Sequence, residues 1–236
     1  MFKVLSGVRQ GEILSPYLFI VYVDDMLERL NSMGCKFFGY IIGAIMYADA
    51  LISMSNSIYQ LQLMLQACEH ELSILGLKIN FTKSACMRVG QRANYHCVQL
   101  KLSSGEISWT NEVKYLGIYM KSGQKFLCEM SYGKGKFYRS ANAILNKLGK
   151  CRNNMVALKL VSSIALPILL YGIEALSLSN SQIASLEHTW NRAVFKIFST
   201  FDDQIIKQCL FYGDHLPVSH LYAIHKMNFS KKTSDC

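Results

Sequence analysis

Carboxylates in two short stretches are the residues of this sequence best suited to chemistry. The stretch "IMYADALISM" (45–54) carries Asp49 alone, two positions after Tyr47, whereas "VYVDDML" (21–27) carries the adjacent Asp24 and Asp25. Divalent cations such as Mg²⁺ prefer hard oxygen ligands, so either stretch is a candidate metal site. The elements that carry the two stretches decide between them.

Asp24 and Asp25 fall within a predicted helix. A helical pattern runs from about Ser15 to Asn31, where Ser15 is the expected N-cap and Pro16 suits the first helical position. Because both aspartates lie on this continuous pattern, we expect them to be ordinary acids on a helix surface.

Asp49 follows a run of strand-forming residues. Apolar runs at 36–42 and 44–54, separated by Gly43, predict a β-hairpin or two adjacent strands. Asp49 stands where such a strand could turn, and a turn displays a carboxylate to a metal better than a helix flank does. Asp49 is therefore the candidate ligand.

The rest of the chain changes character near residue 120. Before this point the periodicity predicts one more helix and several short strands, and after it the pattern is helical. The expected fold is therefore α+β over residues 1–120 and all-α over residues 121–236. The predicted helices are 57–77, 125–149, 154–176, 180–198, 203–211 and 217–228, and the predicted strands lie around 83–89, 97–102, 106–109 and 113–120.

Positive charge is concentrated in the second half of the 236-residue chain. Residues 1–120 hold ten Lys/Arg and nine Asp/Glu, a net charge of +1, whereas residues 121–236 hold fifteen and seven, a net charge of +8. Between 121 and 159 there are nine basic residues and only one acid, Glu129. Such a stretch suits a polyanion such as nucleic acid, and the alternative is a solvated helix face.

Several other features favour an intracellular protein, in the nucleus or cytoplasm, rather than a secreted one. The eight cysteines form no C-x-x-C pair, and the first residues, "MFKVLSGVRQGE", lack the apolar core of a signal peptide. The apolar stretch 160–173 is shorter than the roughly 20 residues that a membrane span needs, so no membrane partner is expected.

His215, His220 and His225 recur every five residues, which does not stack ligands on one helix face, so zinc is not expected. The pair Asp202 and Asp203 is expected to cap a short helix.

The segment "GVRQGEILSPYLFIVYVDDM" (7–26) closely resembles the reverse transcriptases of non-LTR (LINE-type) retrotransposons, and weaker similarities follow in the family's order. An intron-maturase or retron origin is the alternative within the enzyme class. The similar segments are "YADA" (47–50), "GLKINFTKS" (76–84), "KYLGIYM" (114–120), "LPILLYGIEALSLS" (166–179) and "LEHTWNRAVFKIF" (186–198).

The resemblance implies a partial right-hand polymerase. Residues 1–120 would be the C-terminal part of the palm, with antiparallel hairpin strands packed on helices. Residues 121–236 would be a basic helical thumb and a further helical region. The implied activity is RNA-directed DNA synthesis from deoxynucleoside triphosphates, by nucleotidyl transfer with two metal ions, on an RNA template and a DNA primer.

The resemblance also implies that this chain has lost its chemistry. In the family three aspartates hold Mg²⁺, one upstream of the Gln-Gly segment and two adjacent in the hairpin box. Here Asp49 fills the first box position, but Ala50 stands at the second, and the chain begins six residues before Gly7. One carboxylate is a poor cage for two dications, so we expect impaired Mg²⁺ binding and an inactive polypeptide.

Further site residues are implied by matching positions. Gln10 and Gly11 would line the nucleotide pocket, and the alternative is a turn before a helix. Lys83 would help to protonate the leaving pyrophosphate. Its alternative is a lysine in water at a strand end, and Ser84 replaces the family's usual threonine beside it.

Two sets of residues would hold nucleic acid. Tyr115, Leu116 and Gly117 would form the primer grip, and the alternative is an ordinary core strand. On the predicted thumb helix, basic residues would track the backbone of the RNA/DNA hybrid, while aromatic residues between them suit either nucleic acid or core packing. The basic residues are Lys134, Lys136, Arg139 and Lys147, and the aromatic residues are Tyr132, Phe137 and Tyr138.

Two function hypotheses stand beside an ancestral polymerase. One is a non-catalytic RNA- or DNA-binding protein that reuses the basic helix. The other is a remnant without function, whose palm lacks a strand beside the hairpin and therefore exposes apolar surface.

Overall fold

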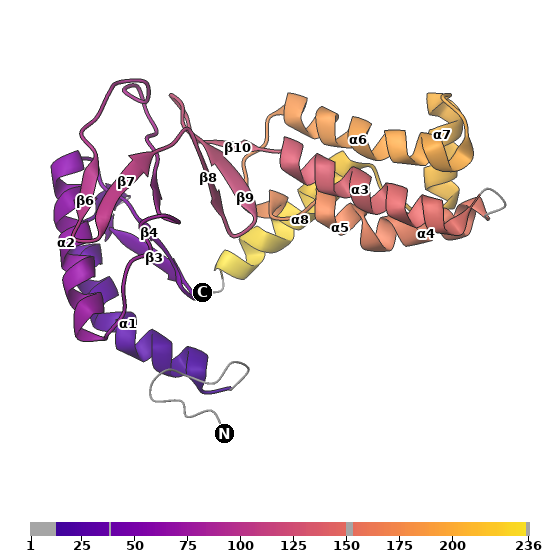
Figure 1. Ribbon diagram of the computed structural model, residues 1–236. Coiled ribbons are helices and arrows are strands. Elements are labelled where there is room, and N and C mark those ends of the chain that lie inside the picture. Colours follow the sequence, from indigo (N-terminus) through magenta and orange to yellow (C-terminus); the bar gives the residue numbers. More distant parts are fainter. Residues whose placement is uncertain (1–12, 38, 150–152, 235–236) are drawn as a thin grey trace. The chain divides into compact units, whose positions relative to one another are not determined.

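The computed structural model describes residues 13–37, 39–149 and 153–234, and it divides the chain into two compact units (Figure 1). The first unit comprises Met1–Leu116 and Met120–Leu127, and the second comprises Gly117–Tyr119 and Cys128–Cys236. The first unit mixes helices and strands, and the second is largely helical. The mixed α/β class predicted from the sequence is thus confirmed, whereas the assignment of the units to palm and thumb stays a prediction.

Two helices and the second of two hairpins build the main core of the first unit. Asn31, near the end of the first helix, accepts hydrogen bonds through Oδ1 from the backbone N–H groups of Gly43 and Ala44, both at 2.9 Å. These bonds fix the start of the second hairpin against the helix. The elements are α1 (Ser15–Ser32), β1 (Cys35–Phe37), β2 (Tyr40–Ile42), β3 (Ala44–Tyr47), β4 (Ala50–Ser53) and α2 (Ile58–Ile74). The buried residues are Val23, Met26, Leu30, Ala44, Met64 and Cys68.

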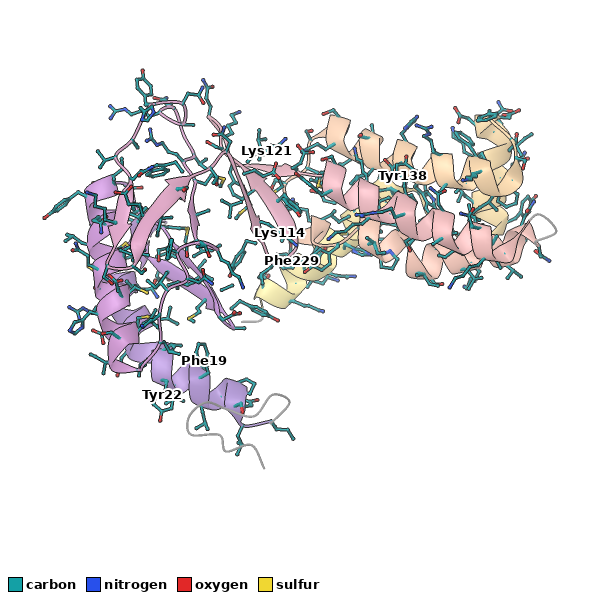
Figure 2. The ribbon with its side chains drawn as sticks, viewed as in Figure 1. Phe19, Tyr22, Lys114, Lys121, Tyr138 and Phe229 are labelled. Carbon is teal, nitrogen blue, oxygen red and sulfur yellow. The ribbon has the colours of Figure 1, made fainter. Side chains whose placement is uncertain are left out.

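Helix α1 differs from the expectation at its start. Leu14 is the N-cap and caps through no side-chain hydrogen bond, so the prediction that Ser15 caps the helix was wrong, although Pro16 stands in the first turn as expected. The first half of α1 exposes large apolar side chains, with Val21 73% and Tyr22 65% exposed. Phe19 packs against the core, and Figure 2 shows it on a different side of the helix from Tyr22.

The apolar runs 36–42 and 44–54 form two hairpins rather than one. β1 pairs with β2 within the first run, and β3 pairs with β4 within the second, all antiparallel. Gly39, with φ of 87°, lies in the first connection. Gly39 is a residue type that favours turns, so the first run did contain a local sign of this hairpin, which the pattern of apolar residues alone had not used.

Short strands complete the first unit and lead into the second. In one sheet the central β7 pairs in parallel with β5 and antiparallel with β6. A second sheet has the order β10-β9-β8. The predicted helix 125–149 begins only at Ser131, because residues 127–129 form a strand. The strands are β5 (Ala85–Cys86), β6 (Leu100–Leu102), β7 (Gly105–Trp109), β8 (Glu112–Tyr115), β9 (Ile118–Lys121) and β10 (Leu127–Glu129).

The second unit packs its helices around Trp190 and Phe137, both fully buried. The predicted helix 154–176 is broken, because Pro167 starts a separate short helix and Gly172 takes φ of 72°. Asp202 caps its helix by accepting from the N–H of Gln204 at 2.8 Å, as expected. The elements are α3 (Ser131–Leu148), α4 (Asn154–Ile164), α5 (Leu166–Leu169), the 3₁₀ helix η1 (Ile173–Ala175), α6 (Asn180–Phe198), α7 (Asp203–Tyr212) and α8 (Val218–Ser234). Among the described helices, none has the length and apolar character of a membrane span.

Candidate catalytic and nucleic-acid-binding residues

Asp49 lies at the tip of the β3–β4 hairpin. Tyr47 pairs with Ala50, so Ala48 and Asp49 form a two-residue turn. Ala48 takes a positive φ of 51°, as the first central residue of a tight hairpin turn often does. The carboxylate of Asp49 is exposed, and among the described residues it makes no ion pair or side-chain hydrogen bond.

The described residues do not supply a set of ligands for Mg²⁺ around Asp49. Nowhere in residues 13–37, 39–149 and 153–234 do three or more His, Cys, Asp or Glu side chains gather where they could hold a metal ion. Asp24 and Asp25 are exposed on α1, as expected for helix-surface acids. Mg²⁺ requires near-octahedral oxygen coordination, and one exposed carboxylate does not fit that requirement.

Lys83 lies in a turn organised by Asn80. The Lys83 backbone N–H donates to the Asn80 carbonyl at 3.2 Å, and Ser84 Oγ donates to the same carbonyl at 2.9 Å. Thr82 Oγ1 donates to Asn80 Oδ1 at 2.7 Å. The Lys83 side chain is exposed, and no described hydrogen bond or ion pair joins it to Asp49. Both its general-acid role and the alternative of a solvated lysine stay predictions.

Tyr115, Leu116 and Gly117 mark the turn between β8 and β9. Leu116 has φ of 46° and Gly117 has φ of 86°, as a two-residue turn with two left-handed positions requires. The positive φ of Gly117 would strain any side chain, and an added Cβ, 3.2 Å from Cε1 of Tyr171, would also require that ring to shift. The Tyr115 hydroxyl is buried and has no hydrogen-bond partner among the described residues. The segment is therefore a tight turn rather than a continuous core strand.

The basic residues of α3 do not share one face. Lys134 Nζ donates to Ser185 Oγ on α6 at 2.5 Å. Lys136, Arg139 and Lys147 are exposed, and their spacing of three and eleven residues puts them together on the opposite side of the helix. The structure thus brings Lys136 and Arg139 together with Lys147 and separates them from Lys134. We call Lys136, Arg139 and Lys147 the α3 basic face.

The aromatic residues of α3 likewise divide into residues that pack in the core and a residue at the surface. Phe137 is fully buried and Tyr138 packs against the helical core, so these two serve packing. Tyr132 is 44% exposed, and its ring stacks on Tyr119 of β9 with centroids 3.8 Å apart. Only Tyr132 is therefore available at the surface to accompany the α3 basic face.

A cavity of about 390 Å³ in the second unit is lined in part by Tyr119 and Tyr171, two residues that the sequence had not indicated. Tyr119, Tyr132 and Lys136 line it together with Gly117 and Tyr171. Tyr171 lies in the segment 166–179 and beside Gly117 of the β8–β9 turn. A contact between residues so far apart in sequence leaves no local signal.

Two further sets of predicted residues are the pair assigned to the nucleotide pocket and the histidines that recur every five residues. Gln10 and Gly11 lie outside the described residues. His215 contacts the edge of the Trp190 ring, with centroids 6.0 Å apart. Burial is the main cause that lowers the His215 pKa, Lys159 adds to the effect, and Asp214 opposes it. His215 therefore belongs to the packing of the helical unit.

Comparison with known proteins supplies the family. Residues 2–120 match the family described as "Reverse transcriptase (RNA-dependent DNA polymerase)". Over 136 residues, or 54% of the chain, the sequence is 33% identical to the "Retrovirus-related Pol polyprotein from type-2 retrotransposable element R2DM" of Drosophila melanogaster. The matched part is 13% of the length of that polyprotein.

The family match contains the Asp49 hairpin, the Lys83 turn and the Tyr115–Gly117 turn. Reverse transcriptases as a family use divalent metal ions and bind an RNA template with a DNA primer. The chain belongs to the reverse transcriptase family, and its relatives are the enzymes of non-LTR retrotransposons.

Proposed function

We propose that this polypeptide binds template–primer nucleic acid but does not by itself synthesise DNA. One observation carries the second half of the proposal: Ala50 occupies the position next to Asp49 on the hairpin tip, so the turn presents one carboxylate instead of two. Two Mg²⁺ ions repel each other strongly, and a single negative charge leaves most of that repulsion uncompensated.

Primer extension tests this half of the proposal. The purified chain is incubated with an RNA template, a DNA primer, deoxynucleoside triphosphates and either Mg²⁺ or Mn²⁺. The expected result is no extended primer with either metal. Template-dependent product that disappears in the Asp49→Ala variant would overturn the proposal, because it would show that one box carboxylate suffices.

The binding half of the proposal is supported by the α3 basic face. Lys136, Arg139 and Lys147 are exposed on one side of α3, and no acidic residue lies within that helix. Each phosphate bound by such a residue releases counterions, so the affinity for an RNA/DNA hybrid should fall steeply with salt. The proposed binding agrees with the intracellular location, in the nucleus or cytoplasm, that we propose for the protein.

Charge reversal tests the binding surface. The triple variant Lys136→Glu, Arg139→Glu and Lys147→Glu should weaken hybrid binding and reduce the salt slope by about 0.9 for each phosphate that the variant no longer neutralises. The matched control reverses three exposed lysines elsewhere in the same unit, Lys207, Lys231 and Lys232. Equal reductions of affinity in the two triple variants would show that only net charge matters and would reject the α3 basic face.

A comparison of Lys134 with Lys136 tests which lysines of α3 bind phosphate. Because its ammonium group donates to Ser185, Lys134→Gln should alter the salt slope much less than Lys136→Gln does. Measuring both single variants at several salt concentrations distinguishes a residue that holds two helices together from one that binds phosphate.

A further inference from the structure

A second group of basic residues lies in the first unit, in a segment where the family resemblance assigned a role only to Lys83. Between Glu71 and Glu106 the sequence contains no acidic residue. The centre of this segment is the connection between β5 and β6, residues 87–99, which we call the 87–99 loop. Figure 1 shows it as a loop beyond the ends of β6 and β7. The basic side chains of the acid-free segment are Lys78, Lys83, Arg88, Arg92 and Lys101, accompanied by His96.

The 87–99 loop is held at both ends by contacts within the first unit. At its start, Gly90 N–H donates to the Gly123 carbonyl at 2.8 Å, and Ser122 Oγ donates to the Arg88 carbonyl at 2.7 Å. At its end, Trp109 Nε1 donates to the Val98 carbonyl at 3.0 Å. The loop is therefore fixed to the rest of the unit by side-chain and backbone bonds.

The middle of the loop is shaped by its own backbone. Ala93 N–H donates to the Gly90 carbonyl at 3.0 Å, and Tyr95 N–H donates to the Arg92 carbonyl at 3.2 Å. These successive turns carry Arg92, Tyr95 and His96 outward, and all three are exposed. The Tyr95 ring is 71% exposed and belongs to no hydrophobic cluster of the unit, so folding does not account for its position.

Arg88 is pre-oriented beside these exposed side chains. Its guanidinium carbon lies 5.4 Å from the centroid of the Trp109 ring, and Nη1 donates to the Arg92 carbonyl at 2.6 Å. A guanidinium group held in this way loses little further freedom when it binds a phosphate. The loop thus combines a fixed cation, an exposed cation and an exposed aromatic ring.

We propose that the 87–99 loop binds single-stranded polynucleotide, with an unpaired base stacked on Tyr95 and neighbouring phosphates bound by Arg92 and Arg88. Stacking on an exposed ring requires an accessible base face, which a duplex hides inside its helix. Phosphate binding alone would leave Tyr95 unused, so the ring favours a single strand over a duplex. The site is distinct from the α3 basic face and does not depend on it.

The experiment measures the binding of the full chain to fluorescent oligouridine, oligothymidine and an RNA/DNA hybrid of equal length. Tyr95→Ala should weaken binding to single strands by roughly 5- to 150-fold, the range expected when one base no longer stacks. Tyr95→Phe should retain the affinity, since it keeps the ring. Arg92→Ala should lower the salt slope by about 0.7, the value for one neutralised phosphate on a single strand.

Matched controls come from the same unit. Tyr59 on α2 is 74% exposed and Lys78 is exposed, so Tyr59→Ala and Lys78→Ala remove the same kinds of side chain elsewhere. Both controls should bind as the unaltered chain does. Far-UV circular dichroism should be unchanged in all variants, because none of the substituted side chains is buried.

The outcomes decide both the site and its ligand. Weakening of both single strands assigns the loop to single-stranded polynucleotide in general, and weakening of one alone assigns it to RNA or to DNA. The proposal is overturned if Tyr95→Ala binds like the unaltered chain or if the hybrid is weakened as much as the single strands. Competition by polyglutamate as strong as that by oligouridine would also overturn it, since this would indicate unspecific anion binding. None of these results depends on whether the chain extends a primer.

Discussion

At the tip of the β3–β4 hairpin, a single residue determines how much negative charge faces solvent. Asp49 is exposed at the turn, and Ala50 begins β4 opposite Tyr47. Ala50 is half-buried, so an aspartate there would begin a strand with its carboxylate close to that of Asp49. The hairpin tip thus has two consecutive positions, 49 and 50, of which only the first carries a carboxylate.

We therefore expect Ala50→Asp to bind Mn²⁺ at least about fivefold more tightly than the unaltered chain. A second unit charge near 4 Å contributes about 1 kcal/mol even at the dielectric constant of water. Electron paramagnetic resonance of free Mn²⁺ measures the affinity. The control Ser53→Asp adds the same charge on the same strand, away from Asp49, and should bind less tightly than Ala50→Asp. Equal affinities in the two variants would mean that the hairpin tip does not act as a ligand pair.

A second residue-scale prediction concerns His215 in the helical unit. Burial and Lys159 lower its folded pKa below the ordinary 6.5, against the opposing charge of Asp214. The unfolded chain therefore takes up a proton at a pH where the folded chain does not. The stability contributed by neutral His215 is fully present above pH 6.5 and is lost as the pH falls through that value towards the folded pKa.

Urea unfolding between neutral and mildly acidic pH measures this effect. The loss of stability on acidification should be smaller in His215→Gln than in the unaltered chain. The matched control His220→Gln removes an exposed histidine from α8. A pH dependence that is the same in all three proteins would contradict the assignment to His215.

At the scale of the element, α3 carries two glycines in its first turns. Neither Gly133 nor Gly135 has a positive φ, and a Cβ at either position would meet no described heavy atom within 4 Å beyond its chain neighbours and the adjoining helix backbone. Glycine in a helix is less favourable than alanine by about 1 kcal/mol. Each of Gly133→Ala and Gly135→Ala should therefore raise the free energy of unfolding by about that amount in urea titrations.

Gly117→Ala is the contrasting control for this prediction. Its φ is 86°, and an added Cβ would lie only 3.2 Å from Cε1 of Tyr171, so this substitution should lower the free energy of unfolding. A change of the unfolding free energy in the same direction for all three substitutions would contradict the backbone conformation described for α3 or for the turn.

Elements specified by nearby residues were predictable from the sequence. Helix α6 has its predicted bounds, because Ser179 and Gln182 form a capping box at its start. The turn at Asp49 was predictable for the same reason, since strand-forming residues flank it on both sides. In these places the residues that determine the structure are neighbours in the chain.

Elements that depend on distant partners were not predictable. Residues 127–129 form β10 because β9 lies beside them, and nothing in their own pattern shows this. Helical spacing already places Lys134 on another side of α3 from Lys136, but the partner of Lys134, Ser185 on α6, is 51 residues away in sequence. The candidate carboxylate could thus be found from sequence, whereas the hydrogen bond that ties Lys134 to α6 required the fold.

At the scale of the whole molecule, each unit has a hydrophobic core of its own. The helical unit is built around Trp190 and Phe137, and all residues of this cluster belong to that unit. Because the core needs no residue from the first unit, we expect the fragment 117–236 to fold alone. The fragment begins at Gly117 because Gly117–Tyr119 belong to this unit.

The fragment should show helical circular dichroism and a single cooperative urea transition. Trp190→Ala should lower its free energy of unfolding by about 3–5 kcal/mol, the cost of removing a large buried aromatic side chain. A fragment that is helical but unfolds without cooperativity would show that the cluster around Trp190 is not sufficient as a core.

The two tryptophans of the sequence lie in different units, so the intrinsic fluorescence of the chain can report on each unit. Trp109, with its indole N–H bonded to Val98 and Arg88 over its ring, reports on the 87–99 loop. Trp190 is fully buried beside His215, so its emission should be blue-shifted and sensitive to protonation of the imidazole. Replacing one tryptophan by phenylalanine leaves a fluorophore that follows the other unit alone. Ligand binding at the loop and unfolding of the helices can thus be recorded separately, without any added label.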